Sequence, residues 1–163
     1  MTTKTVPEPW HSFLGELDAN LSYDLHFHCM GGFVVSVLYG SSRPTADIDV
    51  LVVVPAGEQF RLLTVKGGRG SPLHKRYGVY LDVVAIAQVP EDYETRMTEM
   101  FPGTFEHLRL FALDPYDLAL SKLERNIQRD RDDVRYLART FPLDLAILHE
   151  RYPEGAAAIS CPP

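Results

Sequence analysis

The apolar run within residues 48–54 constrains the fold of this chain more than any other stretch of its sequence. Val50 to Val54 are all Val or Leu, and Pro55 ends the run. Because apolar residues stand at every position rather than at alternate ones, we expect a strand covered on both faces, as in a mixed or parallel sheet under helices. A second apolar run predicts another long strand over residues 78–87.

Shorter signals predict the remaining elements. Asp114 and Pro115 are typical of a helix start, where Asp accepts backbone N–H groups and Pro takes the first helical position. The patterns predict helices over residues 8–22, 32–39, 58–65, 91–96, 115–126, 130–139 and 143–151, and strands over residues 24–29, 98–101 and 107–113. We therefore expect an α/β (α+β) fold: a short, mixed, twisted sheet with flanking helices, followed by a C-terminal helical segment.

Length and composition limit the classes of protein to consider. With 163 residues, 45% of them hydrophobic, the chain predicts a single domain over residues 1–163 that buries a real core. We place its core at about 20–113, C-terminal helices at about 114–152 and a disordered tail at about 153–163. No apolar stretch is long enough for a membrane span, and the N-terminus lacks the apolar core of a signal peptide. Two cysteines make no disulfide framework, so we expect free thiols in a cytoplasmic protein.

Two carboxylates stand at the start of the first apolar run, in the order Asp47-Ile48-Asp49. Because residues i and i+2 of a strand point to the same side, both side chains should project together. Asp82 interrupts the second run and joins them if the two strands are neighbours. Three clustered oxygen ligands suit a divalent cation, and two such ions suit phosphoryl or nucleotidyl transfer.

These carboxylates are also compatible with purely structural roles. Asp47 and Asp49 could cap the turn before the strand, and Asp82 could face water on an edge strand. Phosphatases of the haloacid dehalogenase type also use Asp-x-Asp, but their motif follows the apolar strand, whereas this one precedes it. A metal-dependent phosphotransferase or hydrolase of another fold would need Asp49 at the C-terminal end of a strand.

Gly31 and Gly32 stand between the strand predicted over 24–29 and the helix that follows it. Backbone N–H groups at a helix start bind phosphate, and glycine lets the phosphate come close. Ordinary packing of a tight turn accounts for the pair equally well.

A basic stretch lies between Glu58 and Asp82, with no acidic residue inside it. In a chain of net charge −6, this stretch could receive a triphosphate or an RNA backbone, although solvated loops of this composition are common. Its glycines and Pro72 predict a mobile loop at 67–72. The basic residues are Arg61, Lys66, Arg69, Lys75 and Arg76.

The ordered motifs resemble the DNA polymerase β-type nucleotidyltransferase superfamily. They read Met30-Gly31-Gly32, then Asp47-Ile48-Asp49-Val50, then Asp82 on a later strand. The spacer between Gly32 and Asp47 is similar in length to that of the minimal bacterial branch that includes AbiEii-type toxins. A motif of that branch is also matched by Arg43-Pro44-Thr45-Ala46-Asp47-Ile48-Asp49. Later helices of that branch are matched by Ser121-Lys122-Leu123 and by Arg129-Asp130-Arg131-Asp132-Asp133.

The resemblance implies transfer of a nucleoside monophosphate from an NTP to a hydroxyl acceptor on RNA, tRNA, a protein or a small molecule. It implies Mg²⁺ or Mn²⁺ held by Asp47, Asp49 and Asp82, and a nucleotide held by Gly31, Gly32, Arg43 and Lys122. It also implies that Asp133 either pairs with Lys122 or lies at the rim of the site, and it suggests the toxin of a toxin–antitoxin pair with an antitoxin protein as partner. From its position on its own helix, Lys122 is expected to be solvated. The alternative function is a non-catalytic module of the same fold that binds a nucleotide or a partner.

Overall fold

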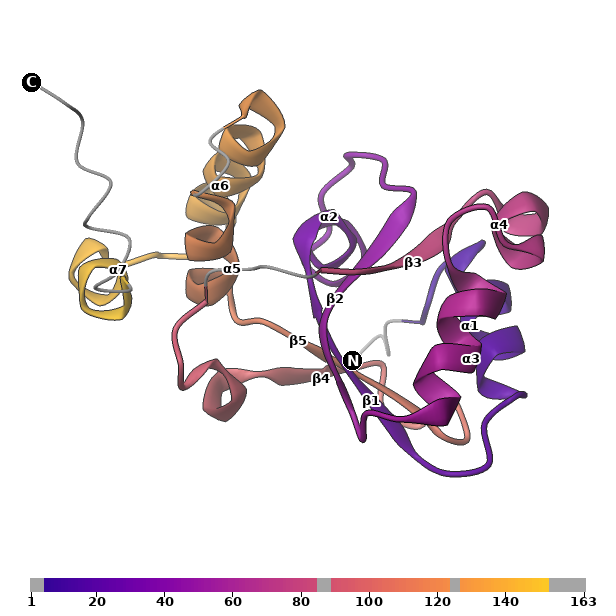
Figure 1. Cartoon of the computed structure of the whole chain (residues 1–163). Helices are drawn as coiled ribbons and strands as arrows, with labels where there is room; N and C mark the ends of the chain where they lie inside the picture. Colours follow the sequence, from indigo (N-terminus) through magenta and orange to yellow (C-terminus); the bar gives the residue numbers. More distant parts are fainter. Residues whose placement is uncertain (1–4, 85–88, 124–126, 153–163) are drawn as a thin grey trace, which may run out of the picture. The chain divides into compact units, whose positions relative to one another are not determined.

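The computed structural model describes residues 5–84, 89–123 and 127–152, with only the backbone at Val52 and Val53. The chain divides into two compact units (Figure 1). The first unit is Met1–Ala85 with Thr98–Ala112, and the second is Ile86–Met97 with Leu113–Pro163. The predicted tail at 153–163 lies outside the described residues, and so do the ends of the elements predicted at 78–87 and 115–126. The single domain stays a prediction.

The first unit contains a five-stranded mixed sheet in the order β3-β2-β1-β5-β4. β1 pairs antiparallel with β2 and parallel with β5, whereas β2 pairs parallel with β3 and β4 pairs antiparallel with β5. This confirms the α/β prediction with a mixed sheet. The strands are β1 (Leu25–Met30), β2 (Asp47–Val54), β3 (Tyr80–Val83), β4 (Thr98–Met100) and β5 (Leu108–Ala112).

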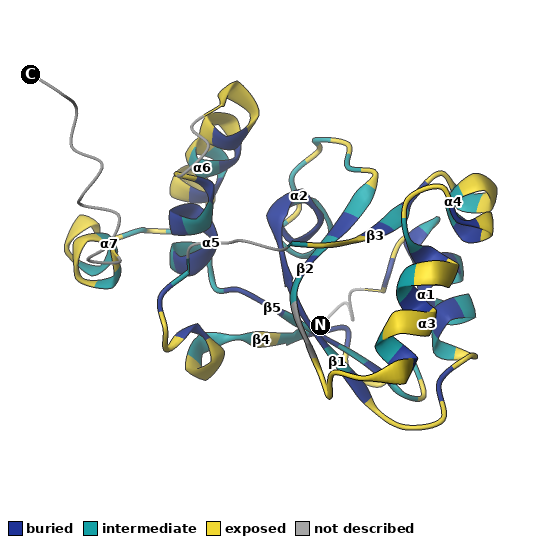
Figure 2. Cartoon of the chain, in the orientation of Figure 1, coloured by how far each residue is buried: buried dark blue, intermediate teal, exposed yellow. Residues whose placement is uncertain are grey.

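Helices of the first unit pack their apolar residues with those of the sheet. The Trp10 ring of α1 lies 4.9 Å from the Phe33 ring of α2, and both are buried with Phe27 of β1. Figure 2 shows β1 and α2 largely buried, whereas α3 and α4 expose much of their surface. The helices are α1 (Trp10–Asp18), α2 (Gly31–Phe33) continued by the π-helix η1 (Val34–Leu38), α3 (Glu58–Gly67) and α4 (Pro72–Tyr77).

Three sequence predictions for this unit need correction. The first helix was expected to reach residue 22 but ends at Asp18, whose carboxylate accepts the backbone N–H groups of His107 and Leu108 at 2.8 and 2.7 Å. The stretch expected as a loop up to Pro72 runs into α4, because the Ser71 hydroxyl accepts the His74 N–H as an N-cap. The prediction that the first apolar run is covered on both faces is also wrong, because Val54 is 45% exposed.

The second unit is helical in its described part. Asp117 of α5 is fully buried, and its carboxylate pairs with the Arg96 guanidinium at 2.8 Å. Arg151 of α7 pairs with Asp114, the N-cap of α5, at 2.7 Å. Both arginines therefore fix the start of α5. None of the described helices has the length and hydrophobicity of a membrane span. The elements are the 3₁₀-helix η2 (Tyr93–Arg96), α5 (Pro115–Lys122), α6 (Gln128–Thr140) and α7 (Leu145–Arg151).

Candidate active site

Three carboxylates converge where β2 and β3 run side by side. The parallel pairing puts Asp49 opposite Asp82, and Asp47 opposite Tyr80. One carboxylate oxygen from each of Asp47, Asp49 and Asp82 lies within 4.8 Å of the others. We call these three residues the acidic triad. Oxygen atoms this close together can ligate one divalent cation or a pair of them.

The alternation of β2 separates the acidic triad from the core. Ile48 and Val50 are fully buried, so Asp47 and Asp49 lie on the opposite face of the sheet and keep part of their surface exposed. Asp82 is exposed on β3, the edge strand next to β2. Asp82 therefore lies on an edge strand and also belongs to the carboxylate cluster, so both roles considered for it from the sequence are compatible with the structure. Asp49 lies near the N-terminal end of β2. This position disfavours the alternative of a phosphotransferase or hydrolase of another fold, which would need Asp49 at the C-terminal end of a strand.

Gly31 lies directly against one carboxylate of the acidic triad. β1 ends at Met30 opposite Asp49, so the chain turns next to that side chain. Gly31 has a φ of +71°, and a Cβ added there would lie 1.8 Å from Asp49 Oδ2. Only glycine accepts both this backbone conformation and this proximity. The turn made by Gly31 and Gly32 is called the glycine turn below.

Arg43 lies against the other residue of the glycine turn. A Cβ added at Gly32 would lie 2.4 Å from Arg43 Nη2 and 3.3 Å from the Thr45 hydroxyl. The Ser36 hydroxyl donates to the Arg43 carbonyl at 2.6 Å, which holds the loop before β2 against η1. The structure thus brings Gly31, Gly32 and Arg43 to the acidic triad.

The acidic triad makes its surroundings electrostatically negative. Burial raises the pKa of the Tyr80 hydroxyl, the charge of Asp47 adds to the shift, and Arg69 opposes it. Burial likewise raises the pKa of the Cys29 thiol, with a further contribution from Asp49. Each added proton or cation in this region relieves repulsion among the carboxylates, so a bound metal ion would be stabilised.

Sequence reasoning missed Tyr80 and His74 near the acidic triad, and it identified Arg69 only as one member of the basic stretch. Tyr80 shares the strand face of Asp82, two residues away, and this spacing was a signal that could have identified it. The His74 ring lies 4.7 Å from the Tyr80 ring, and the Arg69 guanidinium lies 5.9 Å from the same ring. His74 and Arg69 reach Tyr80 only through the turn into α4, which the sequence pattern did not predict.

The predicted basic stretch is divided by its contacts. The Arg76 guanidinium pairs with Glu16 at 2.8 Å, and Lys66 donates to the Asn20 side chain, so both are directed to the α1 region. Arg69 lies on Tyr80 instead. Of the five basic residues, Arg69 is therefore the one that contacts a residue of the candidate site.

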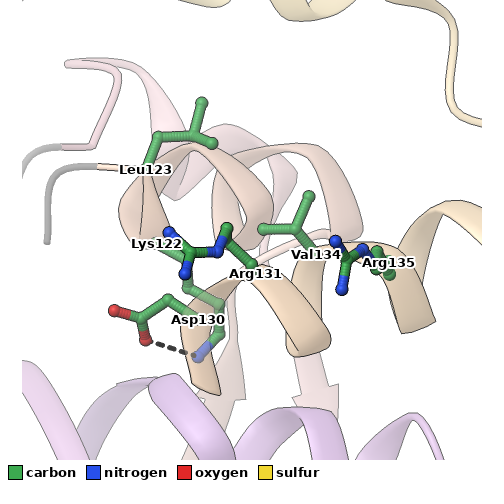
Figure 3. Close-up of a pocket in the computed structure, with 6 residues that line it drawn as sticks. All are labelled: Lys122, Leu123, Asp130, Arg131, Val134 and Arg135. Atoms are coloured by element: carbon green, nitrogen blue, oxygen red, sulfur yellow. Dashed lines mark ion pairs between the residues drawn. The ribbon is translucent and has the colours of Figure 1, made fainter. Parts of the chain in front are cut away.

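Lys122 belongs to the second unit, where it is buried rather than solvated as its helix position suggested. Its ammonium group donates to Asp133 Oδ2 at 2.6 Å and lies 3.9 Å from Asp130 Oδ1, so the pairing with Asp133 is present. Both carboxylates are buried, and Asp133 lies on the face of α6 that Leu137 also uses. A pocket of about 210 Å³ is lined by Lys122, Asp130, Arg131 and Arg135, among others. Figure 3 shows these side chains.

Comparison with known proteins gives one family. A family model described as "Nucleotidyltransferase of unknown function (DUF6036)" matches residues 14–160. No curated protein and no solved structure gives a significant match. The matched residues span both units and include the acidic triad and the glycine turn.

Proposed function

Because the chain belongs to the family of nucleotidyltransferases of unknown function, we propose that it moves a nucleoside monophosphate from an NTP to a hydroxyl acceptor with Mg²⁺ or Mn²⁺. The convergence of Asp47, Asp49 and Asp82 within 4.8 Å carries this proposal. Three carboxylates at this separation repel one another, and a bound divalent cation would relieve that repulsion.

The donor set of the acidic triad fits a hard divalent cation. All its ligand atoms are carboxylate oxygens, which suit Mg²⁺ and Mn²⁺ and disfavour softer metals. Asp47 and Asp49 would hold two ions, and Asp82 would complete the set nearest the attacking oxygen. When bound, the ions supply positive charge to the phosphoryl oxygens of the transition state.

The glycine turn and Arg43 form the nucleotide side of the proposed site. Gly31 and Gly32 carry no side chain, so the buried backbone of the turn lies directly against Asp49 and Arg43. The Arg43 guanidinium would supply a planar donor set for phosphate. Lys122 as a further nucleotide ligand remains a prediction from the resemblance.

The proposed chemistry is a single displacement at the α-phosphorus of the NTP. The acceptor oxygen forms a bond to that phosphorus, the bond to the β-phosphate oxygen breaks, and pyrophosphate leaves. Asp82 takes the proton of the acceptor hydroxyl, and Asp47 and Asp49 keep the reacting groups in place. Positioning and charge supply most of the rate acceleration in such transfers.

Incubation with each α-labelled NTP, Mg²⁺ and total tRNA or cell lysate tests the function. We expect label in an acceptor with the wild type, and at least a 100-fold slower reaction with Asp47→Asn/Asp49→Asn, because bound metal ions supply several kcal/mol of charge stabilisation and about 1.4 kcal/mol is tenfold in rate. Nucleotide binding without transfer by the wild type would support the non-catalytic module instead.

The toxin assignment is a separate, finer proposal. It depends on Arg43-x-Thr45-x-Asp47-x-Asp49, in which Arg43 and Thr45 lie against the glycine turn. We expect induced wild-type chain to arrest bacterial growth and Asp47→Asn/Asp49→Asn not to. An antitoxin protein encoded nearby would then restore growth. Equal growth of the cultures that express the wild type and the double variant would contradict the toxin assignment, while the transferase proposal would stand.

A further inference from the structure

We propose that Arg69 binds a phosphate group of the acceptor, so that the acceptor is a nucleotide chain end whose hydroxyl is presented to Asp82. This inference rests on the proposed function and names the substrate class of the same site. It singles out Arg69 from the basic stretch as a binding residue on the β3 side of the acidic triad.

The sheet order separates two sides of the acidic triad. β1, which leads into the glycine turn, lies on one side of β2, and β3 lies on the other. Gly31 and Arg43 therefore lie toward β1, whereas Tyr80 lies opposite Asp47 on β3. In nucleotidyl transfer the attacking and leaving oxygens are roughly in line across the phosphorus. With the donor phosphates at the glycine turn, the acceptor belongs on the β3 side.

Contacts with the Tyr80 ring, which also packs against His74, hold Arg69 on that side. Its guanidinium lies 5.9 Å from the centre of the Tyr80 ring, within cation–π range. The His74 ring meets the same Tyr80 ring at 4.7 Å. His74 is fixed in turn, because its Nδ1 accepts the Gly70 N–H at 2.8 Å and its own backbone N–H donates to the Ser71 hydroxyl at 3.1 Å. These contacts place the Arg69 side chain on Tyr80, the residue of β3 that lies opposite Asp47.

The charge of Arg69 is available for a ligand. Within the described part of the chain, its guanidinium forms no ion pair with a carboxylate, in contrast to Arg76, which is paired with Glu16. A guanidinium presents several coplanar N–H donors that match a phosphate. A neutral acceptor such as a sugar or a serine hydroxyl would give this cation nothing to bind.

Binding of a 5′-labelled 12-nucleotide single-stranded RNA with a free 3′ hydroxyl, measured by fluorescence anisotropy in Mg²⁺ without NTP, tests the proposal. We expect Arg69→Ala to weaken binding about tenfold, as loss of one charged hydrogen-bonded contact does. The slope of log K against log salt should fall by about 0.7, the value for one phosphate contact on a single strand. Arg61→Ala is the matched control, because Arg61 is an exposed arginine of α3 in the same basic stretch and should change neither quantity.

A second pair of variants checks the role of the ring. Tyr80→Phe keeps the cation–π surface and should bind RNA as the wild type does, whereas Tyr80→Ala should reproduce the Arg69→Ala loss. Competition with adenosine monophosphate tests the strand end itself. We expect no displacement of the RNA at equal concentration, whereas displacement would overturn the strand end and indicate a mononucleotide acceptor.

Two further outcomes would overturn the inference. Unchanged RNA affinity and salt slope in Arg69→Ala would assign this arginine to solvent. Weaker binding of a non-hydrolysable NTP analogue by Arg69→Ala, with RNA binding intact, would move Arg69 to the donor side. The proposed function fails differently: the wild type would then show no Mg²⁺-dependent binding of the NTP analogue, whatever Arg69 does.

Discussion

Gly31 and Gly78 share a left-handed backbone but differ in what surrounds them. Their φ angles are +71° and +74°, and a Cβ at Gly31 would lie 1.8 Å from Asp49 Oδ2, whereas nothing lies within 4 Å at Gly78. We expect Gly31→Ala and Gly78→Ala each to lose about 1–2 kcal/mol of unfolding free energy through backbone strain. Gly31→Ala should also displace Asp49 and lose the increase in Tm that Mg²⁺ gives the wild type.

Thermal unfolding with and without Mg²⁺ measures this difference. A ligand that binds only the folded state at about 100 times its Kd stabilises by about 2.7 kcal/mol, so the wild-type response is large enough to compare. Gly78→Ala should keep the full response, which separates strain from damage to the acidic triad. A normal Mg²⁺ response in Gly31→Ala would show that the metal site lies elsewhere.

The pairing of α5 with α6 depends on one buried cation. Lys122 donates to Asp133 at 2.6 Å and lies 3.9 Å from Asp130, and all three residues are buried. Removing one partner of a buried ion pair leaves an uncompensated charge, which costs about 3–5 kcal/mol. We therefore expect Lys122→Ala to be strongly destabilised in urea unfolding.

Lys75→Ala is the control for Lys122→Ala, because Lys75 is exposed on α4 and its loss should leave the unfolding free energy unchanged. The same experiment separates a structural role of Lys122 from a nucleotide-binding role. A structural cation predicts loss of stability in Lys122→Ala. A stable Lys122→Ala chain with weakened NTP binding would instead identify Lys122 as the nucleotide ligand that the resemblance implies.

The free energy of unfolding should decrease at alkaline pH, because each unit buries a protonated group whose pKa is raised by folding. Burial raises the pKa of Tyr93 to about 12, above its ordinary value near 10, and raises the pKa of the Cys29 thiol. The folded chain then holds protons that the unfolded chain releases, so the unfolding free energy decreases as pH rises. For Tyr93 the loss begins near pH 10 and is complete above its folded pKa.

Urea unfolding midpoints at about pH 8, 10 and 11 measure this dependence. Tyr93→Phe removes one of these groups and should reduce the loss between the two higher pH values without changing its sign. A midpoint that stays constant over the whole series in the wild type would contradict the assigned burial of these protons.

Local patterns in the sequence were sufficient to predict the strands, the order of the motifs and the face that Asp47 and Asp49 share. The apolar runs, the period of two along β2 and the cap at Asp114 depend on neighbouring residues alone. The Ser71 cap and Pro72 were also local signals, but the glycines before them favoured a loop, so α4 was missed. The length of α1 and the coverage of β2 depended on contacts with distant segments.

Which residues meet was determined by packing between segments far apart in the chain. The register of β2 with β3 brings Asp82 opposite Asp49, and a shift of one residue would have turned Asp82 to the other face. The same kind of packing buried Lys122 against Asp133, although its helix position suggested solvent. It also placed Arg69 on Tyr80, apart from the rest of its basic stretch. The free energy of such pairings arises only when the sheet and helices have formed, because the cost of closing long loops must first be met.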